Sequence, residues 1–510
     1  MSHPDVCLLL EGTFPYVRGG VSSWVDQLIR AHPHLTFAIF FIGSDHSSTK
    51  VRYYEVPENV VDFREMFLFE RPDASELEPA RLAPEITLQL RERLEAIYFA
   101  ADDRTRVPAV LEVADWLGAE GAAVRFGNLL HDRVCWEILR SVYEKKFSGI
   151  SFIDFFWTCR FLHQPLWQMI RSVGQIPKAG VYQCVSTGYA GALGALVSHR
   201  NQAPCFLTEH GIYTKERMIE IVQADWIHEP PGHGILSGQG RLALKNLWID
   251  MFSFLGRMSY AASDPIISLY SGNARLQAEF GADPQKIEII PNGVFPDRFQ
   301  ATRDRREQSP GTGGCRIAFV GRIVPIKDVK TLLRATRMAA DVVPDLRVSL
   351  HGPASEDEAY SDECHEMVAS LGLEAIVRFP GSGKIEEILG DEDVVVLTSI
   401  SEALPLVILE AFASKLPVIA TDVGACRELL NGRTLEDKRL GRGGILTEIS
   451  SPSETAEAIV RLARDPALRA RMGEAGFQRV LEFYNQEKVM ARYDQIYGTL
   501  KSRGRAAWRG

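Results

Sequence analysis

The sequence predicts an α/β protein with two doubly wound, Rossmann-like domains, and three observations support that prediction. Short apolar runs alternate with segments of helical periodicity in both halves of the chain, as strands alternate with covering helices in a parallel sheet. The chain of 510 residues is too long for a single hydrophobic core. Residues 300–314 are polar, charged and glycine-rich, which is typical of a linker between two halves.

The first half begins with a strand–loop–helix–strand pattern. We expect a buried strand at 6–10, a loop with Gly19 and Gly20, an amphipathic helix, and a strand at 37–42. Residues from about 72 to 175 intersperse acidic and basic side chains and show few strand signals, so they predict a helical insertion. The alternation then resumes, with strands expected at 179–184, 205–208, 265–269 and 287–290 and a helix at 190–199.

The second half repeats the pattern after the linker. Strands are expected at 316–320, 346–350, 375–379, 394–397 and 417–421, with a helix at 329–338 among the helical stretches between them. A last long helix is expected at 486–500, and the basic tail 501–510 is expected to be loose. The predicted domains are therefore 1–300, which includes the insertion, 301–484, and a C-terminal segment at 485–510.

The composition narrows the class of protein. Hydrophobic residues make up 46% and charged residues 24% of the chain, as in an ordinary soluble globular protein. A net charge of −9 without a basic domain disfavours a nucleic-acid binder. No secretory signal is evident, and the most apolar stretch, 152–170, is too polar to span a bilayer because it contains Asp154 and Arg160. Eight scattered cysteines without a CxxC pair predict free thiols and a cytoplasmic location.

The most informative segment is 399–410, because it joins an expected strand to an expected helix. Glu402 and Glu410 flank this turn, where a parallel sheet presents its ligands. Pro405 suits the first turn of the helix. The amides of Leu406 and Val407 would then face a phosphate while the two acids bind hydroxyls, a combination that suits a nucleotide-linked sugar. Two acids at this spacing are common by chance, so the prediction rests on their position between an expected strand and an expected helix.

Two further loops follow expected strands. Arg322 and Lys327 lie between a strand and a helix, where two cations can neutralise a diphosphate; the alternative is a pair of solvated surface charges. Gly19 and Gly20 would let the backbone approach a phosphate or a sugar, and the alternative is a tight turn without a ligand. They do not form a G-x-G-x-x-G fingerprint, so a nicotinamide site is disfavoured.

The remaining motifs are weaker. His210 ends an expected strand, at the edge where ligands bind, although a lone histidine is more often structural. Residues 381–384 resemble the end of a P-loop but lack its first glycine and its Ser or Thr. The acidic run 391–393 precedes its strand and therefore reads as a polar turn rather than a metal site. No His/Cys set has zinc spacing, so we expect no metal.

Together with 208–211 and 291–294, these motifs resemble the retaining GT-B glycosyltransferases of family 4, in that family's order and over nearly the whole chain. Within it, residues 11–24 and the helical insertion look most like the PelF group, which acts in bacterial synthesis of the Pel exopolysaccharide. The resemblance implies two Rossmann-like domains that face a cleft, a nucleotide-sugar donor held mainly by the C-terminal domain, and a last helix that crosses back to the first domain.

The resemblance also implies roles for individual residues. Arg322 and Lys327 would bind the donor diphosphate, Glu402 the donor sugar and Glu410 the ribose hydroxyls, while His210 would lie near the reaction centre. The remaining donor contacts would come from Gly19, Gly20, Leu404, Pro405, Leu406 and Val407. The donor would be a UDP-hexose or a UDP-N-acetylhexosamine and the acceptor a growing polysaccharide, with no metal or other cofactor. The partners would be proteins of an inner-membrane Pel synthesis and transport complex, which would hold the chain peripherally at that membrane.

Two positions depart from the family pattern. Ala403 stands where the family usually has glycine after the first acid, so a methyl group narrows the space beside the donor sugar, and Phe295 interrupts the usual Asn-Gly-Val-Asp. Two rival functions also remain. One is a GT-B phosphorylase, which needs a lysine that holds pyridoxal phosphate, and the other is a non-catalytic subunit that binds nucleotide sugars.

Overall fold

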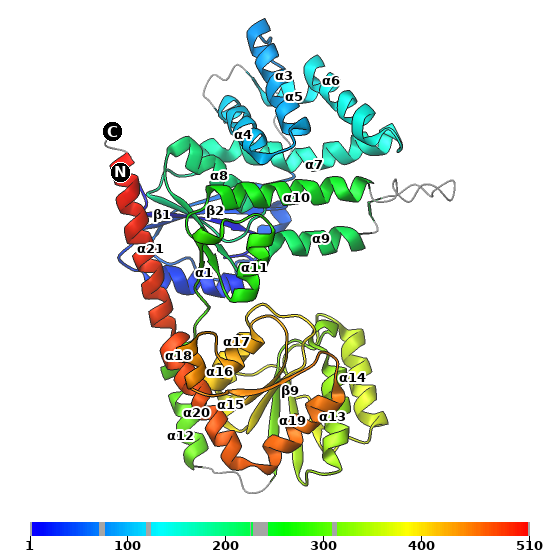
Figure 1. Ribbon diagram of the computed structural model, residues 1–510, viewed down its shortest axis with the longest axis vertical. Helices are drawn as coiled ribbons and strands as arrows, with labels where there is room; N and C mark the ends of the chain where they lie inside the picture. Colours follow the sequence, from blue (N-terminus) through cyan, green and yellow to red (C-terminus); the bar gives the residue numbers. More distant parts are fainter. Residues whose placement is uncertain are drawn as a thin grey trace. The chain divides into compact units, whose positions relative to one another are not determined.

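The computed structural model describes residues 3–70, 77–118, 124–224, 226–227, 243–308 and 314–507. These residues form two units. The first comprises those within 1–268, 274–288 and 493–510, and the second those within 269–273 and 289–492. Each unit has its own sheet and its own hydrophobic cores, so the expectation of two Rossmann-like α/β domains is confirmed. Figure 1 shows both sheets with their covering helices.

The first unit is built on a seven-stranded sheet in the order β3-β2-β1-β4-β5-β6-β7, parallel from β3 through β6. Its strands are β1 (Val6–Glu11), β2 (Phe37–Gly43), β3 (Val60–Phe67), β4 (Val181–Cys184), β5 (Cys205–Glu209), β6 (Ile266–Ser268) and β7 (Ile287–Ile289). The sequence analysis missed β3, because this edge strand mixes charged and apolar residues and buries only its last two.

Helices cover both faces of this sheet because alternate strand residues point to opposite sides. Cys7 and Leu9 of β1 pack with α8 (Tyr189–Asn201) and α10 (Ala243–Ala262). Phe37 of β2 lies on the other face, against Tyr497 of the C-terminal helix α21 (Gln486–Ala507). The helices that complete the unit around the sheet are α1 (Gly20–Ala31), α9 (Tyr213–Gln223) and α11 (Ser271–Glu279), the last of which begins in the second unit.

The chain between β3 and β4 is helical. It contains α3 (Pro84–Phe99), α4 (Asp103–Gly118), α5 (Phe126–His131), α6 (Arg133–Val142) and α7 (Phe152–Ser172), in blue to cyan in Figure 1. Buried Leu94, Ile138 and Phe155 join these helices to the core above the sheet. The insertion therefore extends the first unit's core rather than forming a separate one.

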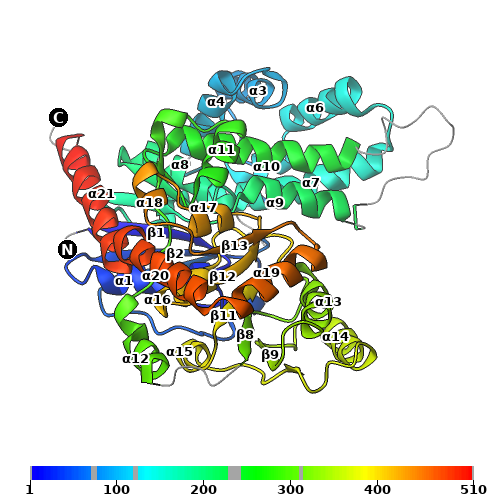
Figure 2. The same cartoon turned by 60° about the horizontal axis from the view of Figure 1, so that its bottom comes forward.

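The second unit is built on a six-stranded parallel sheet in the order β10-β9-β8-β11-β12-β13. Its strands are β8 (Cys315–Val320), β9 (Leu346–His351), β10 (Val377–Arg378), β11 (Val394–Leu397), β12 (Val418–Thr421) and β13 (Gly444–Thr447). Val394 and Val396 face one core, while Val395 and Leu397 face another, so both faces are covered. Figure 2 shows β8, β9, β11, β12 and β13 of this sheet, with α13 (Val329–Ala340) and α19 (Pro452–Arg464) beside them.

The helices of this unit are α12 (Gln300–Gln308), α13 (Val329–Ala340), α14 (Glu358–Ser370), α15 (Ile385–Gly390), α16 (Leu406–Ala413), α17 (Cys426–Asn431), α18 (Leu435–Arg439), α19 (Pro452–Arg464) and α20 (Pro466–Phe483). Single helical turns occupy His46–Thr49, Tyr143–Phe147, Val173–Gln175, Pro284–Lys286, Pro296–Phe299 and Pro325–Lys327.

Two expectations about irregular segments are wrong. Residues 300–308 of the expected linker form helix α12, because the buried guanidinium of Arg303 donates to the carbonyls of Pro296 and Ala413, at 2.9 and 2.6 Å, and fixes it in the second unit. Residues 309–313 lie outside the described part. The tail is not loose up to residue 507, because it continues α21 (Gln486–Ala507).

Ion pairs hold this last helix to the first unit. Lys501 pairs with Asp5 at 2.6 Å, and Arg503 pairs with Asp264 at 3.3 Å. The helix begins in the second unit, and its residues from Tyr493 onward belong to the first. Among the described residues, no helix has both the length and the apolar character that a membrane crossing requires.

Candidate active site

The loops that follow β8 and β11 bring two of the expected site residues together. Lys327 ends the helical turn after β8, and its Nζ donates to Oε1 of Glu402, which follows β11. Ser399 Oγ donates to the same oxygen at 2.7 Å. Both charged side chains are largely buried, with 17% of Lys327 and 13% of Glu402 exposed. This ion pair is therefore shielded from water, which strengthens it relative to a surface pair.

Backbone contacts fix these loops to one another. The Ile400 amide donates to the carbonyl of Ile326 at 2.8 Å, and Thr398 Oγ1 donates to the carbonyl of Lys327 at 3.0 Å. Gly424, in the loop after β12, lies against the backbone of Glu402, and its φ is +53°. A Cβ on Gly424 would lie 2.2 Å from the carbonyl oxygen of Glu402, so only glycine fits there without displacing that loop.

Helix α16 begins directly after this turn. Pro405 is its N-cap rather than its first helical residue, and Leu404 is buried in the core beneath it. The N–H groups of Leu406 and Val407 belong to the first turn, where a helix offers no internal acceptor. They can therefore donate to an anion at the same edge of the sheet.

Glu410 lies one turn beyond Leu406, the first residue of α16. Burial raises the pKa of this carboxyl to about 6, with Arg298 opposing that rise and Glu386 adding to it. Its side-chain oxygens accept no hydrogen bond from another described residue, so they are available to hydroxyl donors of a ligand.

Arg322 follows β8 but takes a different partner. Its guanidinium donates to Glu356, and half of its side chain is exposed. Among the described residues, it does not join the Lys327–Glu402 pair. An exposed pair of this kind is weak, so a phosphate could displace Glu356 at little cost.

Three of the expected site residues lie in the first unit. His210 follows β5, and its ring packs edge-on against Trp24 of α1 with 4.6 Å between the ring centroids. Burial lowers the pKa of His210 to about 4, so the imidazole is neutral at neutral pH. Gly19 caps α1 and Gly20 begins it, and a Cβ on either would meet no atom within 4 Å.

The sequence analysis missed Glu11, which ends β1 in the first unit. It accepts from Tyr213 Oη at 2.7 Å and from Ser186 Oγ and the Ala190 amide, each at 3.2 Å. Burial raises its pKa. The available signal was an acid placed immediately after an apolar strand.

Glu209, next to His210, is a second buried acid at this edge. It accepts from Thr187, Tyr260 and Gln277, at 3.0, 2.8 and 2.9 Å, and from the Tyr213 amide at 3.3 Å. Burial raises its pKa as well. Because its oxygens are so fully bonded, Glu209 fixes the chain on both sides of His210.

The described residues contain no group of three or more His, Cys, Asp or Glu that could hold a metal ion. The acidic run before β11 serves structure instead: Asp393 pairs with Arg316 at 3.1 Å, and Glu392 accepts from Ser349 at 2.7 Å. All eight cysteines are free thiols, as predicted.

Two family models match the chain. The description "Domain of unknown function (DUF3492)" covers residues 4–285, which is more than half of the chain, and "Glycosyl transferases group 1" covers residues 300–479. The second match contains the Lys327–Glu402 pair, α16 and Glu410.

Curated relatives match part of the chain. The D-inositol 3-phosphate glycosyltransferase of Streptomyces avermitilis is 32% identical over 42% of this chain and 47% of its own length. The protein of that name from Kineococcus radiotolerans is 35% identical over 40% of this chain and 50% of its own. The chain thus spans about half the length of the curated relatives it matches.

Solved structures match nearly the whole chain in fold. HepE of Anabaena in complex with UDP has a TM-score of 0.58 at 14% identity, over 97% of this chain and 99% of that one. Sucrose-phosphate synthase of Thermosynechococcus elongatus has a TM-score of 0.58 at 16% identity, over 98% and 99%. The fold is that of the GT-B class, residues 300–479 match the model described as Glycosyl transferases group 1, and the chain belongs to the family described as Domain of unknown function (DUF3492).

Proposed function

We propose that this chain is a glycosyltransferase that moves a hexose or an N-acetylhexosamine from a UDP-sugar to a growing polysaccharide. One observation carries the proposal: a shielded lysine–glutamate pair lies at the ligand-binding edge of the second unit's sheet, within the group 1 glycosyl transferase match. The edge also offers helix-start amides and the free carboxylate of Glu410. Cations, amides and acids suit the phosphates and hydroxyls of a nucleotide sugar.

In the proposed reaction, the bond between the anomeric carbon and the UDP oxygen breaks, and UDP leaves with the electron pair. Lys327, Arg322 and the amides of Leu406 and Val407 stabilise the charge that grows on the departing diphosphate. Glu410 accepts from the ribose hydroxyls. Glu402, once Lys327 turns to the phosphate, accepts from the hydroxyls of the donor sugar.

The acceptor hydroxyl attacks from the face that UDP leaves, so the configuration is retained. Its oxygen forms the new bond to the anomeric carbon, and its proton passes to the departing phosphate oxygen. Since His210 is neutral, it can form a hydrogen bond with the sugar without adding a charge to the site. Because two cations and the helix amides neutralise the diphosphate, the reaction needs no divalent metal. We therefore expect transfer to continue in excess chelator, and strict dependence on Mg²⁺ would contradict this step.

The polysaccharide acceptor follows from the resemblance to the PelF group, as do a cytoplasmic location at the inner membrane and partners in a Pel synthesis and transport complex. HepE, which shares the fold, binds UDP, which supports UDP as the donor nucleotide. The curated relatives are named as glycosyltransferases of D-inositol 3-phosphate, so the acceptor of this chain calls for a direct test.

A panel of nucleotide sugars provides that test, scored by release of UDP and by thermal shift. We expect a UDP-hexose or a UDP-N-acetylhexosamine to stabilise the protein and to be turned over. NMR of the product should show the anomeric configuration of the donor, and an inverted product would refute retention. Binding of UDP without transfer, with the partner proteins present, would instead identify a non-catalytic nucleotide-sugar-binding subunit. A visible pyridoxal phosphate absorbance would favour a phosphorylase.

A further inference from the structure

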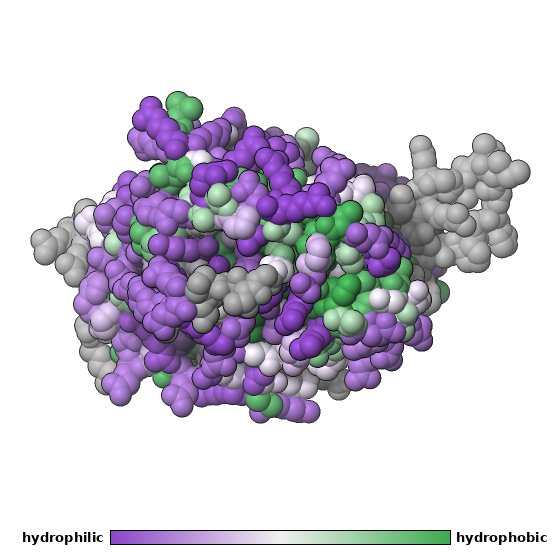
Figure 3. Space-filling model, turned by 90° about the horizontal axis from the view of Figure 1, so that it is seen from below, coloured by the Kyte–Doolittle hydropathy of each residue, from purple (hydrophilic) through white to green (hydrophobic). Residues whose placement is uncertain are grey.

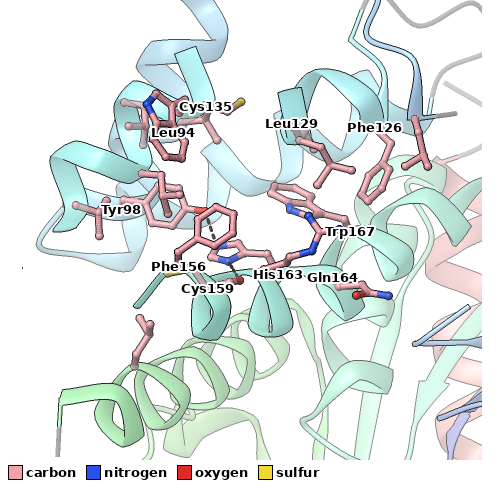
Figure 4. A pocket seen from close by; sticks show the side chains of 18 residues that line it. Leu94, Tyr98, Phe126, Leu129, Cys135, Phe156, Cys159, His163, Gln164 and Trp167 are labelled. Atoms are coloured by element: carbon pink, nitrogen blue, oxygen red, sulfur yellow. Dashed lines mark hydrogen bonds between the residues drawn. The ribbon is translucent and has the colours of Figure 1, made fainter. Parts of the chain in front are cut away.

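The helical insertion of the first unit borders a cavity of about 510 Å³, lined by α3, α5, α6 and α7 together with Leu247 of α10 (Figure 4). Its walls are mainly aliphatic and aromatic, with Leu94, Phe126, Leu139, Phe156 and Trp167 among them. This volume lies within the range of about 300–1,000 Å³ that small-molecule sites occupy. The proposed transferase site uses none of the residues that line it.

Two of the polar side chains that line this cavity, His163 and Tyr98, are already hydrogen-bonded. His163 Nδ1 lies 2.6 Å from the carbonyl oxygen of Cys159, and its Nε2 lies 2.5 Å from Tyr98 Oη; Figure 4 draws the second contact as a dashed line. Burial lowers the pKa of His163, which favours the neutral ring at neutral pH. Its Nδ1–H therefore donates to Cys159, and its Nε2 accepts from Tyr98. The interior presents a neutral wall that suits an apolar chain.

Two polar side chains on the wall are uncommitted. Arg160 and Gln164, one turn apart on α7, make no ion pair or side-chain hydrogen bond with another described residue. None of the described residues that line the cavity carries a carboxylate. Since Arg160 is exposed, its charge lies where the cavity meets solvent. An apolar interior with an unopposed cation at its rim is complementary to a molecule with an apolar chain and an anionic head.

The surface beside the cavity is unusually apolar. Ile153, Trp157 and Phe161 follow one another at intervals of four on α7, and their exposed fractions are 66%, 49% and 55%. Trp136 of α6 is 48% exposed and also lines the cavity. Exposed aromatic residues are favoured where a protein meets a lipid interface, because their rings accept both apolar and wet surroundings. Such a surface could take up an amphiphile from a bilayer.

We infer that this cavity binds the apolar chain of an anionic amphiphile, with the carboxylate or phosphate head at Arg160 and Gln164. The same head-and-chain chemistry occurs in free fatty acids and in anionic membrane lipids, so the experiment has one arm for each source.

The first arm measures the fluorescence of 11-(dansylamino)undecanoic acid with the full-length protein. We expect saturable binding at one site, displacement by oleate, and at least tenfold weaker displacement by oleyl alcohol, which has the same chain without the charge. Inorganic phosphate alone should not displace the probe. Absence of saturable binding, or equal displacement by oleate and oleyl alcohol, would overturn the proposal.

Matched variants locate the site. Arg160→Glu should weaken binding of the probe at least tenfold, whereas Arg104→Glu, the same change at an exposed position outside the cavity, should leave it within about twofold. Equal binding by wild type and Arg160→Glu would contradict the inference. Both variants change exposed side chains, and unchanged melting temperatures would confirm that they fold.

The second arm uses vesicles. Cosedimentation with phosphatidylglycerol vesicles, lost in Arg160→Glu but retained in Arg104→Glu, would identify a membrane lipid as the source. Binding of the free acid without cosedimentation would identify a soluble amphiphile. If neither binds, the cavity is not an amphiphile site.

Discussion

Lys327 Nζ donates to Oε1 of Glu402, and the two side chains are largely buried together at the edge of the second unit's sheet. In the proposed reaction, the lysine binds the donor diphosphate and the glutamate binds the donor sugar. Each holds the other in place before the donor arrives. A bound donor would therefore exchange one ion pair for a phosphate contact and a hydroxyl contact, rather than order two free side chains.

Loss of the Lys327 ammonium should abolish most of the transfer. We expect Lys327→Ala to lower kcat by roughly 100- to 1,000-fold, as removal of one donor to a developing anion typically does. It should also lower the melting temperature, because Glu402 would keep a buried charge without its partner. Steady-state kinetics and thermal melts measure both effects.

Lys330→Ala is the matched control, since Lys330 lies three residues on but pairs with the exposed Glu363. Its kcat should stay within about twofold of wild type, because Lys330 is outside the proposed donor site and 56% of its partner Glu363 is exposed. A near-normal kcat for Lys327→Ala would show that Lys327 does not stabilise the departing diphosphate.

The raised pKa of Glu410 makes a pH-dependent prediction. Because burial raises the folded-state value from 4.5 to about 6, the wild type loses stability relative to Glu410→Gln as pH rises through that window. The difference should be near zero at pH 4 and reach about 2 kcal/mol above pH 6.5, at 1.36 kcal/mol for each unit. Melting temperatures of the two proteins over pH 4–8 measure it, and a pH-independent difference would contradict the buried, uncompensated charge.

The same carboxylate should control nucleotide affinity. UDP should bind wild type more weakly as pH falls below about 6, because the protonated carboxyl accepts fewer hydrogen bonds from the ribose. Glu410→Gln should bind UDP more weakly than wild type at pH 7.5 and lose this pH dependence. Isothermal titration calorimetry measures the affinity of both proteins for UDP at pH 7.5 and below pH 6. If the affinity of the variant depends on pH as that of wild type does, Glu410 is not the ribose contact.

Gly424 tests whether the backbone around Glu402 matters. Gly424→Ala adds a methyl group 2.2 Å from the Glu402 carbonyl at a positive φ, so it should lower both stability and kcat. Gly372→Ala is the control, because Gly372 has φ +65° but open space around its Cβ. That change should cost only the conformational strain of about 1–2 kcal/mol and leave kcat unaltered. Equal effects on kcat would show that the position of this loop is unimportant.

Glu209 tests the buried acids of the first unit. Glu209→Ala would leave Thr187, Tyr260 and Gln277 without their acceptor and should destabilise the protein by about 3 kcal/mol or more. Glu209→Gln should recover part of the loss. Glu220→Ala, at an exposed position of α9, serves as the control with little expected effect. If the melting temperature of Glu209→Ala matches that of Glu220→Ala, the network does not stabilise the fold.

The sequence predicted the buried strands well because their apolar runs are continuous, as in Val394–Leu397, where both faces of a parallel strand are covered. Sequence-based prediction failed where a segment is buried to a different extent than its composition suggests. The sequence does not predict β3, because charged residues interrupt this strand at the sheet edge. It predicts a linker where α12 lies, because the buried Arg303 looks like a surface charge.

The site was only partly accessible from sequence for a similar reason. The chemistry of Lys327 and Glu402 could be inferred from their loops, but their contact depends on β8 lying beside β11, a neighbourhood that no local pattern encodes. The buried Glu11 was missed because its donors come from residues 175 or more positions away, which only the fold brings together.

The central claim is that the second unit binds the diphosphate of a UDP-sugar with Lys327 and the ribose with Glu410. A crystal structure of the chain with UDP tests it most directly. We predict a diphosphate oxygen within hydrogen-bond distance of Lys327 Nζ, the Lys327–Glu402 contact broken, and a ribose hydroxyl on Glu410. A UDP molecule bound away from these residues, with the ion pair intact, would contradict the account.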